Sequence, residues 1–247
     1  MSRVRVSPLL FRRVHKWVGL TLGLQFVLWT ISGAVMALLD SDAVGGHGGS
    51  QDHAATIVWR DVLVPPASAL GSAPVIGLTL RQVASTPVYE VRSRTGVMLL
   101  DARNGRRVNI DEALARSVAA DASTAPVQSV TRLPTANLEA RDHEGPMWRV
   151  DFADAANTSA YVSADTGRLL ATRGDAWRTW DFFWMLHNMD YVGRTSFNHP
   201  LIIFVAFGAL WLSLTGFYLL FRSFKRSDFR WLLRRRTERH RSDANQG

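Results

Sequence analysis

The chain has 247 residues, of which 47% are hydrophobic, and its 29 Lys and Arg residues outnumber its 21 Asp and Glu residues. Such a high apolar content, with 10% aromatic residues, excludes a disordered or collagenous chain. Because there is no cysteine, disulfides, iron–sulfur clusters and thiolate zinc sites are also excluded. Any bound metal must therefore be held by His, Met, Tyr or carboxylate side chains.

Two uncharged apolar runs, at residues 18–39 and 201–221, lie near the ends of the chain. They predict transmembrane helices over 18–39 and 200–222. At about 1.5 Å per residue, each run is long enough to cross a hydrocarbon core of about 30 Å. The first run is too long for the apolar core of a signal peptide, and the acidic residues that follow it do not resemble a cleavage site. We therefore expect a retained anchor.

The distribution of charge predicts the orientation. Residues 1–16 contain five Lys or Arg and no acid, and residues 222–247 contain nine Lys or Arg and three acids. The segment between them has 15 Lys or Arg and 18 acids, a net charge of −3. The positive-inside rule then predicts a bacterial inner-membrane protein with both termini cytoplasmic and the middle periplasmic. Anionic lipids of the bilayer account for the basic tails, so no nucleic-acid partner is expected.

Neither apolar run contains Asp, Glu, Lys, Arg or His, which argues against proton pumps and ion-coupled carriers. The basic N-terminus covers residues 1–17, and the basic tail, residues 223–247, is expected to form a juxtamembrane helix over 225–241. A Gly-rich linker at residues 40–55 contains His47 and His53, which we interpret as solvated linker residues.

Residues 56–173 predict a small periplasmic α+β domain with an internal repeat, at 87–108 and 147–170. In each copy, two alternating strands precede a turn that contains Asn-Gly or Thr-Gly, and glycine there supplies a positive φ. A short helix is expected over 110–120, so the plan is strand, strand, helix, strand, strand around one core. The predicted fold class is membrane-anchored α+β, with two transmembrane helices flanking this domain. No catalytic grouping is evident within it.

These features together resemble a known family. The repeats, each closed by a D-x-x-[TN]-G-x turn, are similar to PepSY modules. The stretch from Arg13 to Leu20 and the later Leu186-His187 pair resemble the PepSY-associated transmembrane family, and the likeness covers nearly the whole chain. Larger members, implicated in siderophore reduction, have four spans where this chain has two, although a homodimer would restore four. The resemblance implies a haem-carrying electron-transfer protein.

Residues 174–199 form the densest aromatic segment, for which we expect a helix from Asp175 to Asp190 followed by a turn. One face of this helix should carry several aromatic residues and a histidine, as is typical of the bilayer–water boundary: Trp177, Trp180, Trp184, His187 and Tyr191. His199 follows 12 residues after His187, beside Pro200 at the start of the second span. Gly193 and Asn198 would allow the chain to turn back, which would bring both imidazoles to one depth.

A haem b needs two axial ligands, an apolar slot and cations for its propionates. His187 and His199 are the predicted axial ligands of the haem iron, and His15 is the candidate ligand of a second haem, opposite His240 or the His15 of a dimer mate. The remaining candidates are Trp184 and Phe183 as apolar walls, Arg194 or Arg178 for the propionates, Asp190 or Asn188 as acceptors for a ligand's second nitrogen, and Met185 and Met189 as alternative ligands. The competing interpretation is an aromatic membrane anchor in which His187 is only an interfacial residue.

Two functions therefore compete. In the first, the protein passes electrons through haem b toward a periplasmic acceptor such as a ferric chelate, as a homodimer or within a larger membrane redox complex. This would make it a ferric-siderophore-reductase-like oxidoreductase or an electron-transfer subunit. In the second, the protein is a non-enzymatic, membrane-anchored PepSY interaction or regulatory protein, whose domain binds a peptide, protease or receptor partner by β-strand addition.

Overall fold

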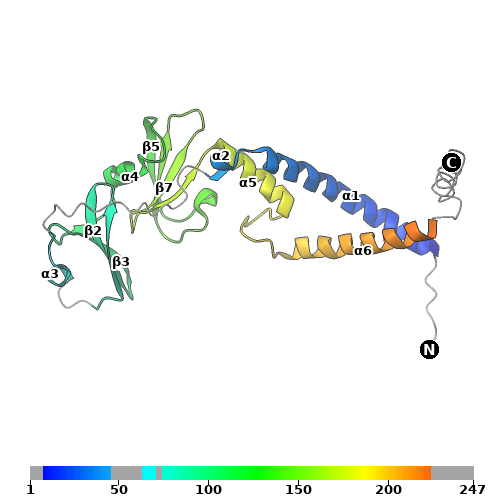
Figure 1. The fold of residues 1–247 in the computed structure, drawn as a ribbon, viewed down its shortest axis with the longest axis horizontal. Coiled ribbons are helices and arrows are strands. Elements are labelled where there is room, and N and C mark those ends of the chain that lie inside the picture. The colour runs from blue at the N-terminus through cyan, green and yellow to red at the C-terminus, as the bar shows by residue number, and fades with distance from the viewer. Residues whose placement is uncertain (1–7, 46–62, 71–73, 224–247) are drawn as a thin grey trace, which may run out of the picture. The chain divides into compact units, whose positions relative to one another are not determined.

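The computed structural model describes residues 8–45, 63–70 and 74–223. The chain divides into two compact units, a helical unit (Met1–Gly33 and Met185–Gly247) and a β unit (Ala34–Trp184). Figure 1 labels several of their elements, and two helices, α1 and α5, have residues in both units. The expected linker histidines at 47 and 53 and the expected helix at 225–241 lie outside the described residues.

The helical unit is built around the first and last long helices, α1 (Pro8–Leu38) and α6 (Pro200–Ser223). Both are long and apolar enough to cross a membrane. Large side chains such as Phe207 and Phe221 on α6 are 68% and 76% exposed, which suits a lipid environment better than water. Both helices begin at a proline, where the missing N–H has no helical partner to lose.

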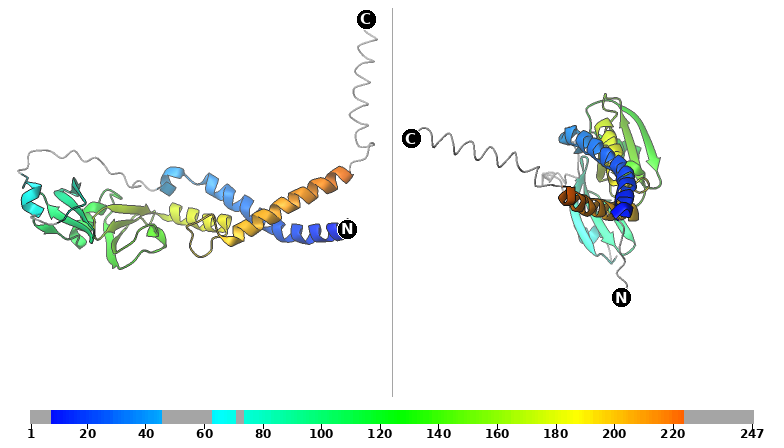
Figure 2. Two further views of the ribbon diagram at one scale, coloured as in Figure 1. Left: turned by 90° about the horizontal axis from the view of Figure 1, so that it is seen from below. Right: turned by 90° about the vertical axis from the view of Figure 1, so that its right-hand side faces the viewer.

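The two long helices run antiparallel and cross, as Figure 2 shows. At the crossing they approach closely, because a Cβ added to Gly208 would lie only 2.9 Å from Leu22 Cδ1. One turn away, Gly19 faces Leu212 at 3.7 Å on the same measure. Small residues permit this approach between membrane helices. Around the crossing, Leu22, Val205 and the loop residue Met189 form a buried apolar cluster.

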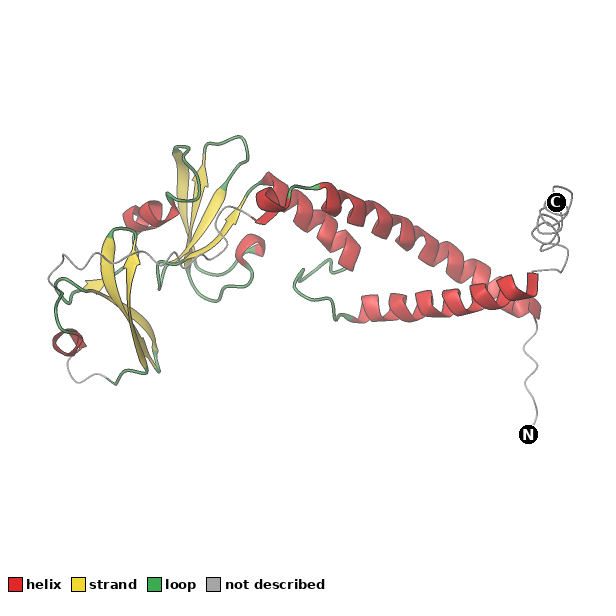
Figure 3. Cartoon of the chain, in the orientation of Figure 1, coloured by secondary structure: helices red, strands yellow, loops and turns green. Residues whose placement is uncertain are grey.

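The β unit contains two antiparallel four-stranded sheets, shown in Figure 3. The first sheet consists of β1 (Gly77–Val83), β2 (Thr86–Ser93), β3 (Gly96–Asp101) and β4 (Arg107–Val108), paired in that order. The second consists of β5 (Val127–Leu133), β6 (Met147–Phe152), β7 (Ser159–Ser163) and β8 (Leu169–Arg173), also in chain order. Short helices accompany them: α2 (Ser41–Gly45), α3 (Pro66–Leu70), α4 (Glu112–Ala119) and the 3-10 turn η1 (Leu138–Ala140).

The expected repeat is present, but each copy is larger than predicted. The predicted pairs correspond to the β2–β3 and β6–β7 hairpins, and β1 and β5 precede them as additional strands. Their alternation is hard to recognise because both are outer strands whose side chains are mostly half-buried or exposed. The closing turns contain Gly105 and Gly167 at φ +70° and +64°, so the positive φ predicted at both positions is confirmed.

One apolar core joins both sheets through α4. The carboxylate of Asp111 caps this helix by accepting the Leu114 N–H at 2.9 Å. Buried side chains come from the first sheet, from α4 and from the second sheet: Val83, Val88, Leu99, Ile110, Ala115, Ala119, Val150, Phe152, Ala160 and Val162. The central domain is therefore α+β and is flanked in sequence by the two apolar helices, as the sequence predicted.

Helix α5 (Asp175–Asn188) ends two residues before the predicted limit. Met189 adopts φ +56°, a left-handed conformation that cannot continue the helix. Tyr191 therefore lies outside the helix, and the expected five-residue aromatic face is shortened to its first four members.

Candidate functional site

His187 lies in the last turn of α5 and packs against α1. Its Nδ1 is 3.1 Å from the hydroxyl of Ser32, and its ring centroid is 6.3 Å from that of Trp29. A Cβ on Gly33 would lie 3.3 Å from His187 Cε1, so the glycine makes room for the ring. Nε2 has no hydrogen-bond partner within residues 8–45, 63–70 and 74–223.

His15 occupies a similar environment near the other end of the helix pair. Its Nδ1 is 2.8 Å from the hydroxyl of Thr215 on α6, and its ring centroid is 6.3 Å from that of Trp211. A Cβ on Gly216 would lie 3.7 Å from His15 Cε1. Its Nε2 likewise makes no hydrogen bond to any part of the chain that the structure describes.

His199 follows the turn after α5, and its Nε2 already has a hydrogen-bond partner. This nitrogen is 2.6 Å from the backbone carbonyl oxygen of Asn188, the residue that follows His187. The bond joins the end of α5 to the start of α6, where Pro200 opens the helix. The expected reversal of the chain is therefore present. For His199 to bind a metal through Nε2, it would have to exchange this carbonyl for the metal.

The turn between the two helices is organised by Asp190. Its carboxylate accepts backbone N–H groups from Gly193, Thr195 and Ser196 at 3.0, 2.9 and 3.4 Å. Although burial opposes it, these hydrogen bonds lower the pKa of Asp190 to about 2. The Asp190 carboxylate is therefore bonded to backbone N–H groups of its own loop. The hydrogen-bond partner of His187 Nδ1 is the Ser32 hydroxyl instead. Arg194, a candidate for binding propionates, adopts φ +51° within the same turn and is half-buried.

Two of the tryptophans that were expected at the bilayer–water boundary, Trp177 and Trp184, pack against arginine side chains. Trp177 is 8% exposed and lies beneath Arg173, whose Cζ is 4.4 Å from the ring centroid. Trp184, the expected haem wall, stacks on Trp180 at 6.2 Å and has the Arg141 guanidinium 5.9 Å from its ring. This part of α5 therefore packs within the β unit through cation–π contacts.

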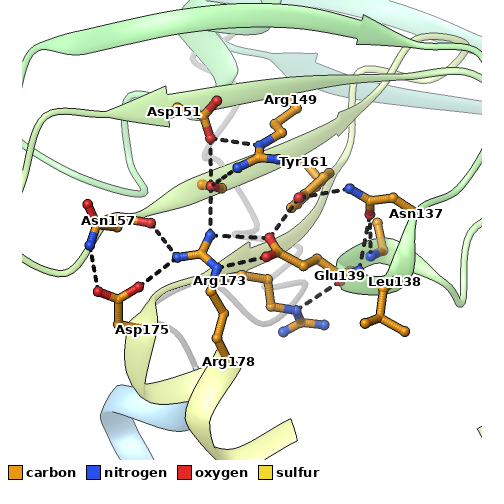
Figure 4. Close-up of polar contacts among 12 residues, drawn as sticks. Asn137, Leu138, Glu139, Arg149, Asp151, Asn157, Tyr161, Arg173, Asp175 and Arg178 are labelled. Atoms are coloured by element: carbon orange, nitrogen blue, oxygen red, sulfur yellow. Dashed lines mark hydrogen bonds and ion pairs between the residues drawn. The ribbon is translucent and has the colours of Figure 1, made fainter. Parts of the chain in front are cut away.

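A polar network fixes the start of α5 to the second sheet, as Figure 4 shows. Arg178 Nε donates to Glu139 Oε1 at 2.7 Å, and the Tyr161 hydroxyl donates to Glu139 Oε2 at 2.7 Å. Burial would raise the pKa of Glu139, but these two hydrogen bonds outweigh it and the pKa lies below its ordinary value. Burial and the neighbouring carboxylate raise the pKa of Tyr161 to about 12. Arg178, a candidate for binding propionates, is thus committed to this network.

The first sheet contains an apolar hollow beside its outer strand β1. The hollow is open, measures about 420 Å³, and is lined by Leu63, Val64, Pro65, Pro66, Leu78, Leu80 and Tyr89. Within the described segments, no group of three or more His, Asp or Glu residues is positioned to hold a metal. The histidines of the helical unit are therefore the candidate functional side chains.

Sequence reasoning had selected these histidines but missed their partners, Ser32 and Thr215. Both hydroxyls belong to the few polar residues of the apolar runs. Each is directly followed by glycine and preceded by tryptophan three or four positions earlier, as WTISG (29–33) and WLSLTG (211–216). This shared pattern is the sequence feature from which the two partners could have been predicted.

Two long apolar helices and an α+β unit between them in sequence define the class, a membrane-anchored α+β protein. The family model described as the PepSY-associated TM region matches residues 12–244. The chain therefore belongs to the PepSY-associated TM family, as its motifs predicted. No curated protein and no solved structure matches the chain.

Proposed function

We propose that the protein is a b-type haem protein that transfers electrons across the inner membrane toward a periplasmic acceptor such as a ferric chelate. The proposal rests on the hydrogen bonding of two imidazoles, those of His187 and His15. Each has a hydrogen-bonded Nδ1 and an Nε2 without a described partner, and each packs against a tryptophan. Metal-bound histidines in proteins have this arrangement: one ring nitrogen binds the metal, and the other donates its N–H to a neighbouring acceptor.

The donor set suits a haem because its iron takes four ligands from the porphyrin and only two from the protein. His187 and His199 would hold the periplasmic haem, with His199 leaving the Asn188 carbonyl, and Arg194 is the nearest candidate in sequence for a propionate. His15 would hold the second haem together with the His15 of a second copy or with His240. Bound haem would supply the one-electron redox step. The chain would orient the imidazoles and exclude water from them.

Two haems are required by the length of the path. Ser32 and Thr215 contact the two histidines near opposite ends of the helix pair. His15 and Ser32 are 17 residues apart on α1, which corresponds to about 25 Å along the helix. A single group at one end cannot serve both faces of a hydrocarbon layer about 30 Å thick. Two redox groups divide that distance.

The test is the visible spectrum of the full-length protein in detergent, produced in cells supplied with a haem precursor. The reduced wild-type protein should show a low-spin b-type spectrum. His187→Ala and His15→Ala should each remove the haem of their own site only, and His199→Ala should convert the haem at its site from low spin to high spin. The matched control is His143→Ala in the β unit, which should leave the spectrum unchanged. If haem persists fully in the combined His187→Ala and His15→Ala variant, the ligand assignment is wrong.

The second function rests on the apolar hollow beside β1. An outer strand presents backbone N–H and C=O groups to which an extended peptide can add, and adjoining apolar pockets accept its side chains. This function predicts a colourless wild-type protein. It also predicts that a peptide of alternating apolar sequence slows amide hydrogen exchange along β1, and that Leu80→Asp abolishes this effect.

A further inference from the structure

Two pockets of the helical unit are built from the same parts. In each, one turn of a membrane-spanning helix presents a tryptophan, a hydroxyl and the glycine after it to an imidazole from another helix. The α1 pocket of Trp29, Ser32 and Gly33 receives His187. The α6 pocket of Trp211, Thr215 and Gly216 receives His15. The tryptophan–imidazole geometry agrees closely, with 6.3 Å and 42° in the first pocket and 6.3 Å and 41° in the second.

The hydroxyl protons of both pockets are already committed. Ser32 Oγ donates to the Leu28 carbonyl at 2.6 Å, and Thr215 Oγ1 donates to the Trp211 carbonyl at 2.8 Å. A hydroxyl has a single proton, so toward the imidazole each oxygen can only accept. The Nδ1 atoms, at 3.1 and 2.8 Å, must therefore be the N–H donors.

This proton arrangement fixes the tautomer of both rings. A neutral imidazole that carries its proton on Nδ1 has its lone pair on Nε2. Ser32 is 1% exposed and Thr215 6% exposed, so water does not compete for these hydroxyls. In addition, Gly33 leaves room for the ring edge, because a Cβ there would lie only 3.3 Å from His187 Cε1, whereas a Cβ on Gly216 would lie 3.7 Å from His15 Cε1, an ordinary contact.

We propose that Ser32 and Thr215 are positioning residues that hold His187 and His15 as Nδ1–H tautomers and so present both Nε2 lone pairs for coordination. The two ends of the helix pair are then chemically equivalent ligand sites, constructed from one repeated pocket. The tautomer itself does not depend on any bound group. That the coordinated group is haem rests on the proposed function.

The tautomers can be measured without haem. The full-length protein, labelled with ¹⁵N-histidine and prepared haem-free in detergent, reports the proton position of each ring through two-bond ¹H–¹⁵N spectra, with assignment by single histidine substitutions. In the wild type, His187 and His15 should both be Nδ1–H. Ser32→Ala should shift His187 alone toward the Nε2–H form, and Thr215→Val should do the same for His15 alone. An Nε2–H tautomer in the wild type would overturn the proposal.

Matched variants separate positioning from simple packing. Ser32→Thr and Thr215→Ser keep the hydroxyl and should retain the wild-type tautomers. They test the proposal even if Ser32→Ala or Thr215→Val proves poorly folded. Thr30→Ala and Ser213→Ala remove exposed hydroxyls that make the same helical carbonyl bond without a histidine partner, and should change neither ring. Loss of the tautomer in these controls, or its failure to return with the hydroxyl, would contradict the proposal.

A second readout connects the pockets with the proposed function. If haem binds, Ser32→Ala should weaken its affinity at the His187 site by about 10- to 100-fold, the range found when an outer partner of a metal-bound histidine is lost. Fixed tautomers in a protein that binds no haem would leave this inference standing and refute the proposed function. Haem binding with Nε2–H tautomers in the haem-free protein would do the opposite.

Discussion

Glu90 is a carboxylate that holds the two sheets of the β unit together. It is 1% exposed, and it lies 2.6 Å from Arg81 Nε, 3.2 Å from Arg92 and 3.1 Å from Arg168. Arg81 also donates to the carbonyl of Thr166, in the turn before β8. The guanidinium groups thus connect β1 and β2 of the first sheet to the closing turn of the second.

We predict that Glu90→Gln lowers the free energy of unfolding of the β unit by about 1.5–3 kcal/mol, because Arg81, whose side chain is only 15% exposed, loses its charged hydrogen-bond partner. Glu112→Gln is the matched control. Glu112 also pairs with an arginine, Arg116, but its side chain is 55% exposed, so a change of at most about 0.5 kcal/mol is expected. Denaturant titration of the full-length protein, followed by near-UV circular dichroism, compares the two. Equal effects would contradict the bridging role.

A second residue-scale prediction concerns pH. In the folded protein the pKa values of Glu90 and Glu139 both lie below their ordinary value of 4.5, because hydrogen bonds from arginines outweigh the effect of burial. A lowered folded-state pKa contributes stability above the unfolded-state pKa, and this stability is lost as pH falls through the folded-state value. The melting temperature of the β unit should therefore stay constant from pH 7 to about 5 and fall progressively below pH 4.5.

The same measurement on Glu139→Gln supplies the control. This variant should be less stable than the wild type at pH 7, and its melting temperature should fall less steeply below pH 4.5. An acid transition as steep as that of the wild type would show that the Glu139 network does not contribute to it.

At the scale of elements, the two closing turns allow a matched comparison within the repeat. Gly105 and Gly167 have similar positive φ values, +70° and +64°. A Cβ on Gly167 would lie 2.8 Å from Ile110 Cδ1 and 2.9 Å from Val83 Cγ1, whereas on Gly105 its nearest neighbour would be Ala69 Cβ at 3.5 Å. The second turn is therefore packed into the core, and the first is not.

Gly105→Ala should lower the free energy of unfolding by about 1–2 kcal/mol, because a residue with a Cβ is strained in the left-handed conformation. Gly167→Ala should cost about 1–3 kcal/mol more, because the methyl group also overpacks the core. Thermal or denaturant unfolding measures both. A smaller loss for Gly167→Ala than for Gly105→Ala would contradict the packing described for this turn.

The sequence predicted those elements whose signals are local. The glycine turns, the helix capped by Asp111 and the start of α6 at Pro200 all depend on neighbours in the chain, and each was predicted. Strands β1 and β5 were missed because outer strands bury only part of one face. The end of α5 shifted because Met189, a residue without left-handed preference, takes a positive φ where the chain reverses.

The candidate site was only half predictable for a related reason. His187 and His15 stood out as histidines beside apolar runs. Their partners Ser32 and Thr215 are distant by 155 and 200 residues in sequence, and only the packing of α1 against α5 and α6 brings them together. Asp190 was a candidate partner because it is near in sequence, but the amides of its own loop are nearer in space.

At the scale of the whole molecule, the positive charge of both tails predicts that the two termini lie in the cytoplasm. A reporter that is active only in the periplasm should be inactive when fused after Gly247 and active when inserted after Arg94, in the β2–β3 turn. A cytoplasmic reporter at the same positions should give the reverse pattern. Periplasmic activity at the C-terminus would reverse the orientation, and with it the assignment of the His187 site to the periplasmic face.

If the paired helices hold haem, as we propose, the visible spectrum of the wild-type protein shows it. Full-length protein is purified in detergent from cells supplied with a haem precursor and is then reduced with dithionite. We expect a low-spin b-type spectrum, with a haem content that approaches two per chain if His240 completes the second site, or three per pair of chains if two copies of His15 share one haem. A colourless protein recovered folded from haem-replete cells would contradict it.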